Sequence, residues 1–502
     1  MKNKFIFLLI FFIWVLTACV AFSYLFSSNI PFWFDPARDM LSAWANLHKV
    51  TLIGPPSGIP GFFYGPYWVW WLSFALLLSK DPAVVAGLTM TIPYFVIFFG
   101  VLLAFGNMFG KTTSVFLWLL FFISFQGYMT QLWNPYLAPI FFLSILYILV
   151  FFVEKLRDLK SALPLFIAGL LTGIALNIHI SFSVGFSIGC ILYLCMQNLF
   201  FLRQKNIGKQ LLQAMLQIGS FLLGIVIVFF PFFLFEVRHG FTQTKVAWNA
   251  FVHGGNVVLQ HGFTHQEIIA QALLRFAQLI RVPLLPGIVV LVIGLVMYVY
   301  VALRHGYANK EKERNLILLL LSIIFCIMAV YLLAKNPIWD YHFDGFEVLW
   351  LLLLGVVVSR IKVLSYLLIA WTIFLCVVWS GGFVSSLYVN PLSRGSLYTK
   401  EYIVHTIQQN AGKHEYTVFV YNPAIYTYEY NYLFRWITGN EFSYDPGQIQ
   451  RKGIVYIVLP QAKEVIRTDF IHFHTPDRLY KTTKTWQIPD GTTILKRERI
   501  NG

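Results

Sequence analysis

Long apolar blocks, separated by short polar stretches, dominate the pattern of this chain. Most blocks hold about 18 residues or more, the length that an α-helix needs to cross a bilayer core of roughly 30 Å. Their interiors carry almost no charged side chains. The pattern therefore predicts an all-α polytopic membrane protein with about eleven transmembrane helices, at 5–26, 84–109, 112–128, 134–153, 162–180, 181–201, 211–235, 281–303, 315–334, 344–359 and 363–385.

One apolar block differs from the others in length and in its aromatic residues. Pro66 to Lys80 is short for a span, and it carries Trp68, Trp70 and Trp71 near one end. Tryptophan is enriched where a helix meets the interface between lipid and water. We therefore expect an interfacial helix that lies flat on the membrane within a first outer loop, residues 27–83.

Basic residues between the blocks predict the orientation of the chain. Short loops rich in Lys and Arg favour the cytoplasmic side, and these loops follow the spans at 155–160, 203–209, 304–314 and 360–362. With the N-terminus inside, as an uncleaved first helix, they all fall on one side. The stretches 27–83, 129–133, 236–280 and 335–343 then lie outside, together with the C-terminal tail. This arrangement predicts a multi-pass protein, of the bacterial cytoplasmic membrane by its general composition.

The composition changes after residue 385, where the apolar runs shorten to the length of strands. The runs Thr417–Val420, Ile454–Leu459 and Thr493–Leu495 are separated by Asn, Pro and Gly, a pattern typical of short strands and turns. We therefore predict two domains. A transmembrane domain spans residues 1–385, and a small extracytoplasmic α/β domain spans 386–502.

Charge and cysteine content narrow the classes of function. Of the 502 residues, 58% are hydrophobic and only 12% are charged, and the net charge is +15. Many basic residues lie in the short loops, where they anchor the chain to anionic lipid, so nucleic-acid binding is not expected. All five cysteines fall in apolar segments. No metal-binding spacing is present, and neither a metal nor another cofactor is predicted.

Ionisable residues at the membrane surface are the first candidates for chemistry, because charges near lipid are costly. The first outer loop contains Asp35, Arg38 and Asp39 within five positions. An i to i+4 spacing brings the two carboxylates near one another on a helix, and Pro36 suits its first position. A structural role is the alternative, in which Asp35 caps the helix and Arg38 is its ion-pair partner.

A stretch rich in Gly and Pro, Ile53–Pro66, follows this motif and precedes the tryptophan-rich helix. This order of features resembles the GT-C class of polyprenyl-phosphate-sugar glycosyltransferases, in particular the protein mannosyltransferases and the lipid A aminoarabinose transferases. That branch often reads Asp-Glu-Ala-Arg-Tyr in this loop. Here Asp35 and Arg38 are kept, whereas Pro36 and Asp39 replace Glu and Tyr. The likeness in layout covers roughly residues 1–385.

The resemblance implies transfer of a monosaccharide from a polyprenyl-phosphate donor, with inversion, to an acceptor hydroxyl on the outer face. A carboxylate would act as the general base, and either Asp35 or Asp39 could fill that role. Cations would stabilise the departing phosphate; the candidates are Arg38, Arg238, His239, Lys245 and Lys335. Candidates for the substrate pocket come from the outer stretches and their borders: Tyr64, Trp133, Asn134, His179, Tyr341 and His342.

Some of these residues also have a simpler interpretation. Arg238, His239 and Lys245 could be interfacial anchors, Trp133 and Asn134 could belong to an aromatic belt and a turn, and His179 could be a helix-packing residue. The partners predicted are the lipid bilayer, the polyprenyl-phosphate sugar and an acceptor that is a glycolipid, a polysaccharide or a protein. A lipid or solute transporter, and a non-catalytic factor in envelope-glycan assembly, are the alternative functions.

Overall fold

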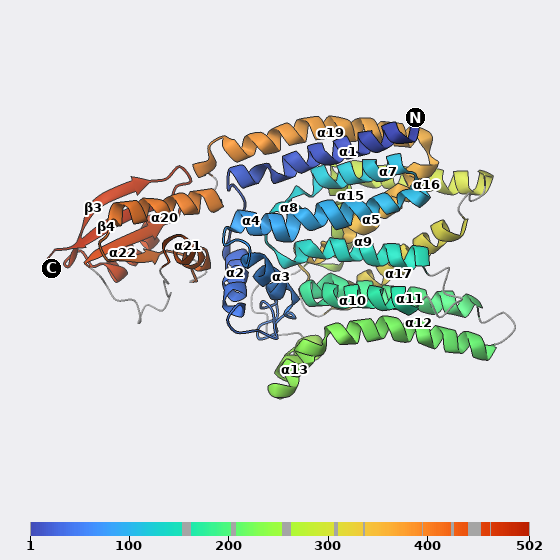
Figure 1. Cartoon of the computed structure of the whole chain (residues 1–502), viewed down its shortest axis with the longest axis horizontal. Coiled ribbons are helices and arrows are strands. Elements are labelled where there is room, and N and C mark those ends of the chain that lie inside the picture. Colours follow the sequence, from blue (N-terminus) through green and yellow to red (C-terminus); the bar gives the residue numbers. More distant parts are fainter. Residues whose placement is uncertain are drawn as a thin grey trace.

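A bundle of apolar helices forms most of the protein, and a small α/β domain lies beyond one end of it (Figure 1). The computed structural model describes residues 2–152, 162–201, 207–253, 263–305, 310–334, 337–393, 395–422, 426–439, 453–461 and 463–500. The chain starts at the far end of the bundle, and the C-terminus lies in the α/β domain (Figure 1). The end of the bundle that faces this domain carries α2 (Phe34–Asn46) and α3 (Tyr67–Leu76). We call it the site end.

The bundle is built from helices that follow one another with short connections. In chain order they are α1 (Lys2–Phe22), α4 (Pro82–Ala86), α5 (Phe99–Ala104), α6 (Gly106–Phe109), α7 (Lys111–Ser124), α8 (Gln126–Thr130), α9 (Asn134–Phe152), α10 (Ala162–Ile178), α11 (Ile180–Phe201), α12 (Ile207–Val228), α15 (His265–Leu279), α16 (Leu284–His305), α17 (Lys310–Leu333), α18 (Phe346–Arg360) and α19 (Lys362–Tyr388). Two π-helical turns, Gly87–Thr91 and Tyr94–Phe98, join α4 to α5 in one continuous apolar segment.

Within the described residues, eight helical segments are long and apolar enough to cross a membrane. A ninth consists of α15 and α16, which are bent by 83° at the break between them, and α7 and α10 are shorter apolar helices. The eight segments, the bent pair and the two shorter helices together lie at the eleven predicted positions. The prediction of a polytopic membrane protein is therefore confirmed.

The prediction that residues 236–280 form one hydrophilic outer stretch is wrong for the segment 265–279. This segment forms α15, which packs against α7, α16, α17 and α18. Thr264 and Glu267 cap its first turn reciprocally: the Glu267 amide donates to Thr264 Oγ1, and the Thr264 amide donates to Glu267 Oε2. The polar residues of this amphipathic helix hid its membership in the bundle.

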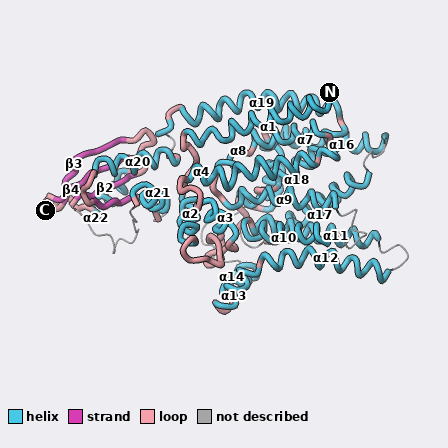
Figure 2. The backbone as a smooth tube through the Cα atoms, in the orientation of Figure 1, coloured by secondary structure: helices cyan, strands magenta, loops and turns pink. Residues whose placement is uncertain are grey.

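Residues between α1 and α4 leave the bundle and return to it at the same end. They contain α2 (Phe34–Asn46) and α3 (Tyr67–Leu76), which lie at the site end among loops (Figures 1 and 2). With 10 residues, α3 is too short to cross a bilayer, as predicted. Trp68 and Leu72 are buried on one of its faces, whereas Trp71 and Phe74 are exposed on the other, so α3 packs by half of its surface.

Small residues let neighbouring helices of the bundle approach closely. A Cβ atom at Gly169 of α10 would lie 2.0 Å from the carbonyl oxygen of Phe221 in α12, and one at Gly224 would lie 2.4 Å from that of Phe166. Close backbone contact of this kind stabilises helix pairs in lipid, where the hydrophobic effect gives no help. The exposed apolar side chains of α12 cover its other faces.

The C-terminal domain is a four-stranded sheet with three helices. The sheet order is β1 (Tyr416–Val420), β2 (Ile454–Leu459), β4 (Thr493–Arg499) and β3 (Tyr480–Gln487), with β1 and β2 parallel and the other pairs antiparallel. The helices are α20 (Leu397–Ala411), α21 (Tyr428–Thr438) and α22 (Glu464–His474). The three predicted strands are confirmed. The polar edge strand β3 was missed, because most of its side chains are exposed and give no apolar run.

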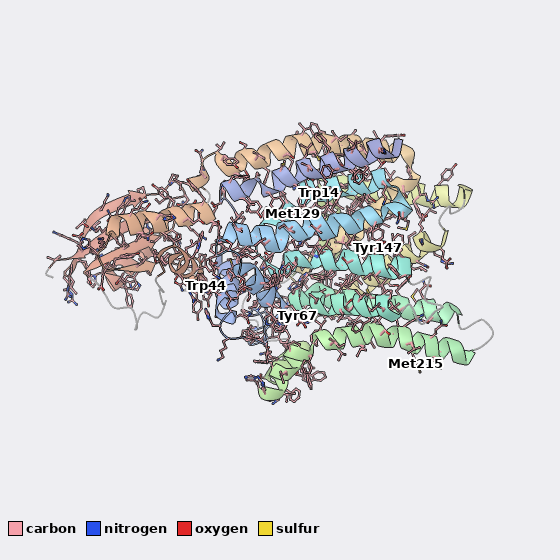
Figure 3. The ribbon with its side chains drawn as sticks, viewed as in Figure 1. Trp14, Trp44, Tyr67, Met129, Tyr147 and Met215 are labelled. Atoms are coloured by element: carbon pink, nitrogen blue, oxygen red, sulfur yellow. The ribbon has the colours of Figure 1, made fainter. Side chains whose placement is uncertain are left out.

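The C-terminal domain is docked on the first outer loop by backbone and side-chain contacts. The amides of Leu397 and Tyr398 donate to the carbonyl oxygens of Ile30 and Ser28, at 2.9 and 3.1 Å. The buried Tyr432 of α21 donates its hydroxyl to Lys80 O, and its ring packs against Trp44 of α2. Trp44 lies where α2 faces this domain (Figure 3). Two segments almost 400 residues apart therefore form one surface at the site end.

Candidate active site

An arginine joins two carboxylates on α2. Arg38 Nη1 lies 2.7 Å from Asp35 Oδ1, and Arg38 Nη2 lies 2.7 Å from Asp39 Oδ1, to which Arg38 Nε also donates. The Trp68 indole of α3 donates to the other oxygen of Asp39 at 3.0 Å. The side chain of Asp35 is 34% exposed, whereas that of Asp39 is fully buried. Only Asp35 therefore presents a carboxylate to solvent.

The local sequence explains this geometry, with one correction. The ion pair between Asp35 and Arg38 is present, but Asp35 does not cap α2, because the helix begins at Phe34 after Trp33. Pro36 is thus the third residue of the helix rather than the first. A proline is tolerated there, since the amides of the first turn have no partner within the helix. Spacings of three and four residues place all three charged side chains on adjoining positions.

Burial acts on the proton affinity of Asp39. It raises the pKa of the Asp39 carboxyl to about 6, and the neighbouring Arg38 opposes this rise. Asp39 therefore takes up a proton more readily in the folded protein than in the unfolded chain. Its contribution to stability is fully present below about pH 4, near the usual pKa, and is lost as the pH rises through about 6.

We expect the stability of the Asp39→Asn variant to lack this dependence on pH. Raising the pH from 4.5 to 7.5 should lower the stability of the wild type relative to the variant by roughly 2 kcal/mol, since only the wild type must ionise a buried carboxyl. Thermal unfolding of the two proteins in detergent, at both pH values, measures the difference. The Asp35→Asn variant is the control and should follow the wild type. Parallel behaviour of Asp39→Asn and wild type would contradict the assignment.

The stretch rich in Gly and Pro folds back on itself and presents Tyr64 to the site. The Gly54 amide donates to Tyr64 O at 2.7 Å, and the Tyr64 amide donates to Pro55 O at 2.9 Å. A Cβ atom at Gly65 would overlap Asn177 Oδ1, at 1.4 Å, so only glycine fits against α10. Tyr64 is buried, which raises the pKa of its hydroxyl well above the usual range. It lies within electrostatic range of Asp35.

Aromatic residues from three segments form a wall beside the first outer loop. Trp133, between α8 and α9, lies 6.3 Å from the ring of Trp33 and 5.5 Å from the ring of Tyr341. The Tyr341 hydroxyl would lie 3.2 Å from a Cβ atom at Gly58, and Asp35 acts electrostatically on Tyr341. The loops at 131–133 and 337–344 thus meet the first loop.

The other predicted pocket residues are buried, and each has a hydrogen bond to the main chain. Asn134 donates to Ile178 O at 2.6 Å, and His179 Nε2 lies 3.0 Å from Asp344 O. His179 Nδ1 has no hydrogen-bond partner among the described residues. His342 accepts the Trp339 amide at Nδ1 and is also buried. None of these three contacts involves Asp35 or Arg38.

Three of the predicted phosphate ligands lie beside the first loop, on two short helices or directly after one of them. Arg238 is at the end of α13 (Phe230–Arg238), His239 follows it, and Lys245 is in α14 (Thr242–His253); all three side chains are exposed. Gln243 Oε1 accepts the Phe63 amide at 2.8 Å, which ties α14 to the loop that carries Tyr64. Lys335 lies outside the described residues.

A buried charge cluster behind the aromatic wall was missed. Arg275 of α15 lies 3.1 Å from Asp344 and 3.4 Å from Glu347, and it donates to Asp340 O at 2.6 Å. The Tyr128 hydroxyl donates to Asp344 at 3.1 Å. The side chains of Arg275, Asp344 and Glu347 are at most 8% exposed. A charged triplet this deeply buried holds the turn Asp340–Phe343, and with it Tyr341, against the bundle.

The signal for this cluster was present in the sequence but divided. Arg275 interrupts an apolar helix face, and Asp344 and Glu347 lie three residues apart at the start of an apolar block. Charges at such positions are costly unless they are paired, so a partner was to be expected. Among the described residues, no group of three or more His, Cys, Asp or Glu side chains is placed to hold a metal ion.

The chain was compared with known proteins. No family model matches it, and neither does any curated protein. Two solved structures of ArnT from Cupriavidus metallidurans are similar. The apo state gives a TM-score of 0.62 and the complex with undecaprenyl phosphate gives 0.60, each at 10% sequence identity. Both alignments cover 99% of this chain and 98% of the other. The similarity shows that the chain has the GT-C fold of ArnT over its whole length.

Proposed function

We propose that the protein is a membrane glycosyltransferase that moves a monosaccharide from a polyprenyl-phosphate donor to an acceptor hydroxyl at the site end of the bundle. The observation that carries the proposal is the partly exposed Asp35, held by Arg38 at the site end of the bundle. The fold supports it, because ArnT is a lipid A aminoarabinose transferase and one of its structures contains undecaprenyl phosphate. We further propose that the site end faces the outside.

In the proposed reaction, Asp35 is the general base. Its carboxylate takes the proton of the acceptor hydroxyl while the hydroxyl oxygen forms a bond to the anomeric carbon of the sugar. The bond between that carbon and the donor phosphate oxygen breaks, and the polyprenyl phosphate leaves with the electron pair. Attack opposite to the leaving group inverts the anomeric centre. Asp39, buried behind Arg38, orients the arginine and does not meet substrate.

The departing phosphate needs cations near it. Arg38 directs its Nη1, Nη2 and Nε atoms toward the two carboxylates. A guanidinium has five N–H groups, so those not used in these contacts can donate to a phosphate oxygen. Arg238 and Lys245 can approach a lipid phosphate from α13 and α14, since both are exposed beside the first outer loop. We propose that these side chains, without a metal ion, stabilise the charge.

Release of free polyprenyl phosphate tests the proposal. The purified full chain is placed in proteoliposomes with a panel of labelled polyprenyl-phosphate sugars, and a membrane extract supplies acceptors. We expect release from at least one donor, dependent on the extract and unaffected by EDTA. The donor that is used names the sugar. If folded protein releases no lipid phosphate from any donor, the proposed function is wrong.

Replacing Arg38 should weaken use of the donor. Because Arg38→Ala alone would leave Asp39 buried without its cation, the variant is made together with Asp39→Asn. A charge-assisted hydrogen bond contributes about 1.5–3 kcal/mol, so we expect the KM for the donor to rise about 10- to 100-fold. Steady-state kinetics at saturating acceptor measure it, with Asp39→Asn as the matched control. An unchanged donor KM would restrict Arg38 to orienting Asp35.

A further inference from the structure

Three aromatic side chains form a cluster where the C-terminal domain meets the start of α2. The rings of Tyr426 and Tyr428 stack at 5.4 Å with an interplanar angle of 4°. The ring of Phe34 lies 4.9 Å from Tyr428 and 6.4 Å from Tyr426, tilted by about 60° to both. We call Phe34, Tyr426 and Tyr428 the aromatic platform.

The aromatic platform adjoins the reactive groups. Phe34 directly precedes Asp35 in the chain, and the guanidinium carbon of Arg38 lies 5.8 Å from the centre of its ring. Tyr428 is within electrostatic range of Arg38. A molecule that covered the platform would therefore lie beside Arg38, the ion-pair partner of the proposed base.

Docking of the C-terminal domain does not use the whole aromatic platform. Tyr432, which is fully buried, docks α21 on the first outer loop through the rings of Phe32 and Trp44 and the carbonyl oxygen of Lys80. Tyr426 is 49% exposed. Loop residues beside a reactive site are where binding groups concentrate, and a tyrosine there offers an aromatic face together with a polar edge.

We propose that the aromatic platform binds a saccharide ring of the acceptor, and that the acceptor is thus a glycan or glycolipid rather than a polypeptide. This inference rests on the proposed function. One face of a pyranose ring presents C–H groups, which pack on the face of an aromatic ring. The rings of Tyr426 and Tyr428 lie parallel, and the exposed side chain of Tyr426 gives such a sugar a surface to pack on.

In this proposal the aromatic wall lies on the side of the donor and the aromatic platform on the side of the acceptor. In the wall of Trp33, Trp133 and Tyr341, the last two residues come from connections between helices of the bundle, from which a lipid-linked donor must come. The platform borders the domain that lies beyond the end of the bundle (Figure 1), on the side where a water-exposed glycan approaches. Asp35 lies between donor and acceptor, where a general base is needed.

The experiment uses the full chain in proteoliposomes with its best polyprenyl-phosphate sugar and a delipidated-protein fraction or a glycolipid fraction of membranes as acceptor. Each fraction is tested intact, after periodate oxidation of its sugars and after protease treatment. Kinetics are measured for Tyr426→Ala, Tyr428→Ala, both Tyr→Phe variants and Tyr402→Ala, an exposed tyrosine of α20 outside the platform.

We expect each Tyr→Ala variant to raise the acceptor KM up to about tenfold, and the double variant more, with kcat and the donor KM within about twofold. The Tyr→Phe and Tyr402→Ala variants should resemble the wild type, and periodate but not protease should destroy the acceptor. An unchanged acceptor KM in the double variant, or an acceptor destroyed by protease alone, would overturn the inference and leave the glycosyltransferase intact. Absence of turnover in the wild type with every donor would instead overturn the proposed function, and the acceptor assignment with it.

Discussion

The Asp35→Asn variant is expected to lose sugar transfer by about 10²- to 10⁴-fold, the range that a general base contributes. The amide keeps the size of the carboxylate but cannot accept a proton. The fold should persist, because Asp35 is partly exposed and Arg38 keeps its contacts with Asp39; an exposed ion pair contributes at most about 1 kcal/mol. Release of polyprenyl phosphate at saturating donor and acceptor measures the effect.

Asp39→Asn is the matched control, because it removes the other carboxylate of the same helix. Asp39 has both oxygens engaged, by Arg38 and by the Trp68 indole, and has no contact with solvent. We expect this variant to keep a substantial part of the turnover. If Asp39→Asn is inactive while Asp35→Asn retains turnover, the base has been assigned to the wrong carboxylate.

Arg275→Met is expected to destabilise the protein by about 3–5 kcal/mol, the largest effect on stability that we predict for a single substitution. The methionine fills most of the space, but it leaves Asp344 and Glu347 buried without a cation. The midpoint of thermal unfolding in detergent should fall accordingly. Transfer should fall as well, because the turn that carries Tyr341 loses its anchor to α15.

Neutralising the two carboxylates separates charge from packing. In the triple variant Arg275→Met, Asp344→Asn and Glu347→Gln, no buried charge of the triplet remains, and we expect most of the lost stability to return. Asp344→Asn and Glu347→Gln without the arginine substitution should be destabilising, since Arg275 then lacks its counter-charges. A single Arg275→Met variant as stable as the wild type would show that the cluster does not support the site end.

The sequence predicts the parts of this structure whose signal is local. The length of apolar blocks places the eleven helical segments, and the tryptophans at the start of α3 distinguish it from a span. The amphipathic α15 was assigned wrongly because Arg275 is polar by sequence and buried by pairing. Its partners are 65 or more positions further along the chain, and nothing local indicates which charges meet.

The candidate site follows the same rule. Spacing alone brings Asp35, Arg38 and Asp39 together on one helix, and the ion pair was foreseen. The different exposure of the two carboxylates was not, because the side chain that covers Asp39 is Trp68, 29 residues away on another helix. Likewise, the contact between the rings of Phe34 and Tyr428 depends on where the C-terminal domain docks, which no local pattern indicates.

The contact between Phe34 and Tyr428 also sets the order in which the protein becomes competent during its synthesis. The α2 segment leaves the ribosome early, whereas Tyr428 follows 394 positions later. At about 5–20 residues per second, roughly 20 to 80 s separate them. During that time the nascent chain has its carboxylates and its arginine but only part of the surface around them. The time needed for translation therefore delays completion of the site. A truncated chain that lacks the last hundred residues would enter the membrane with an incomplete site.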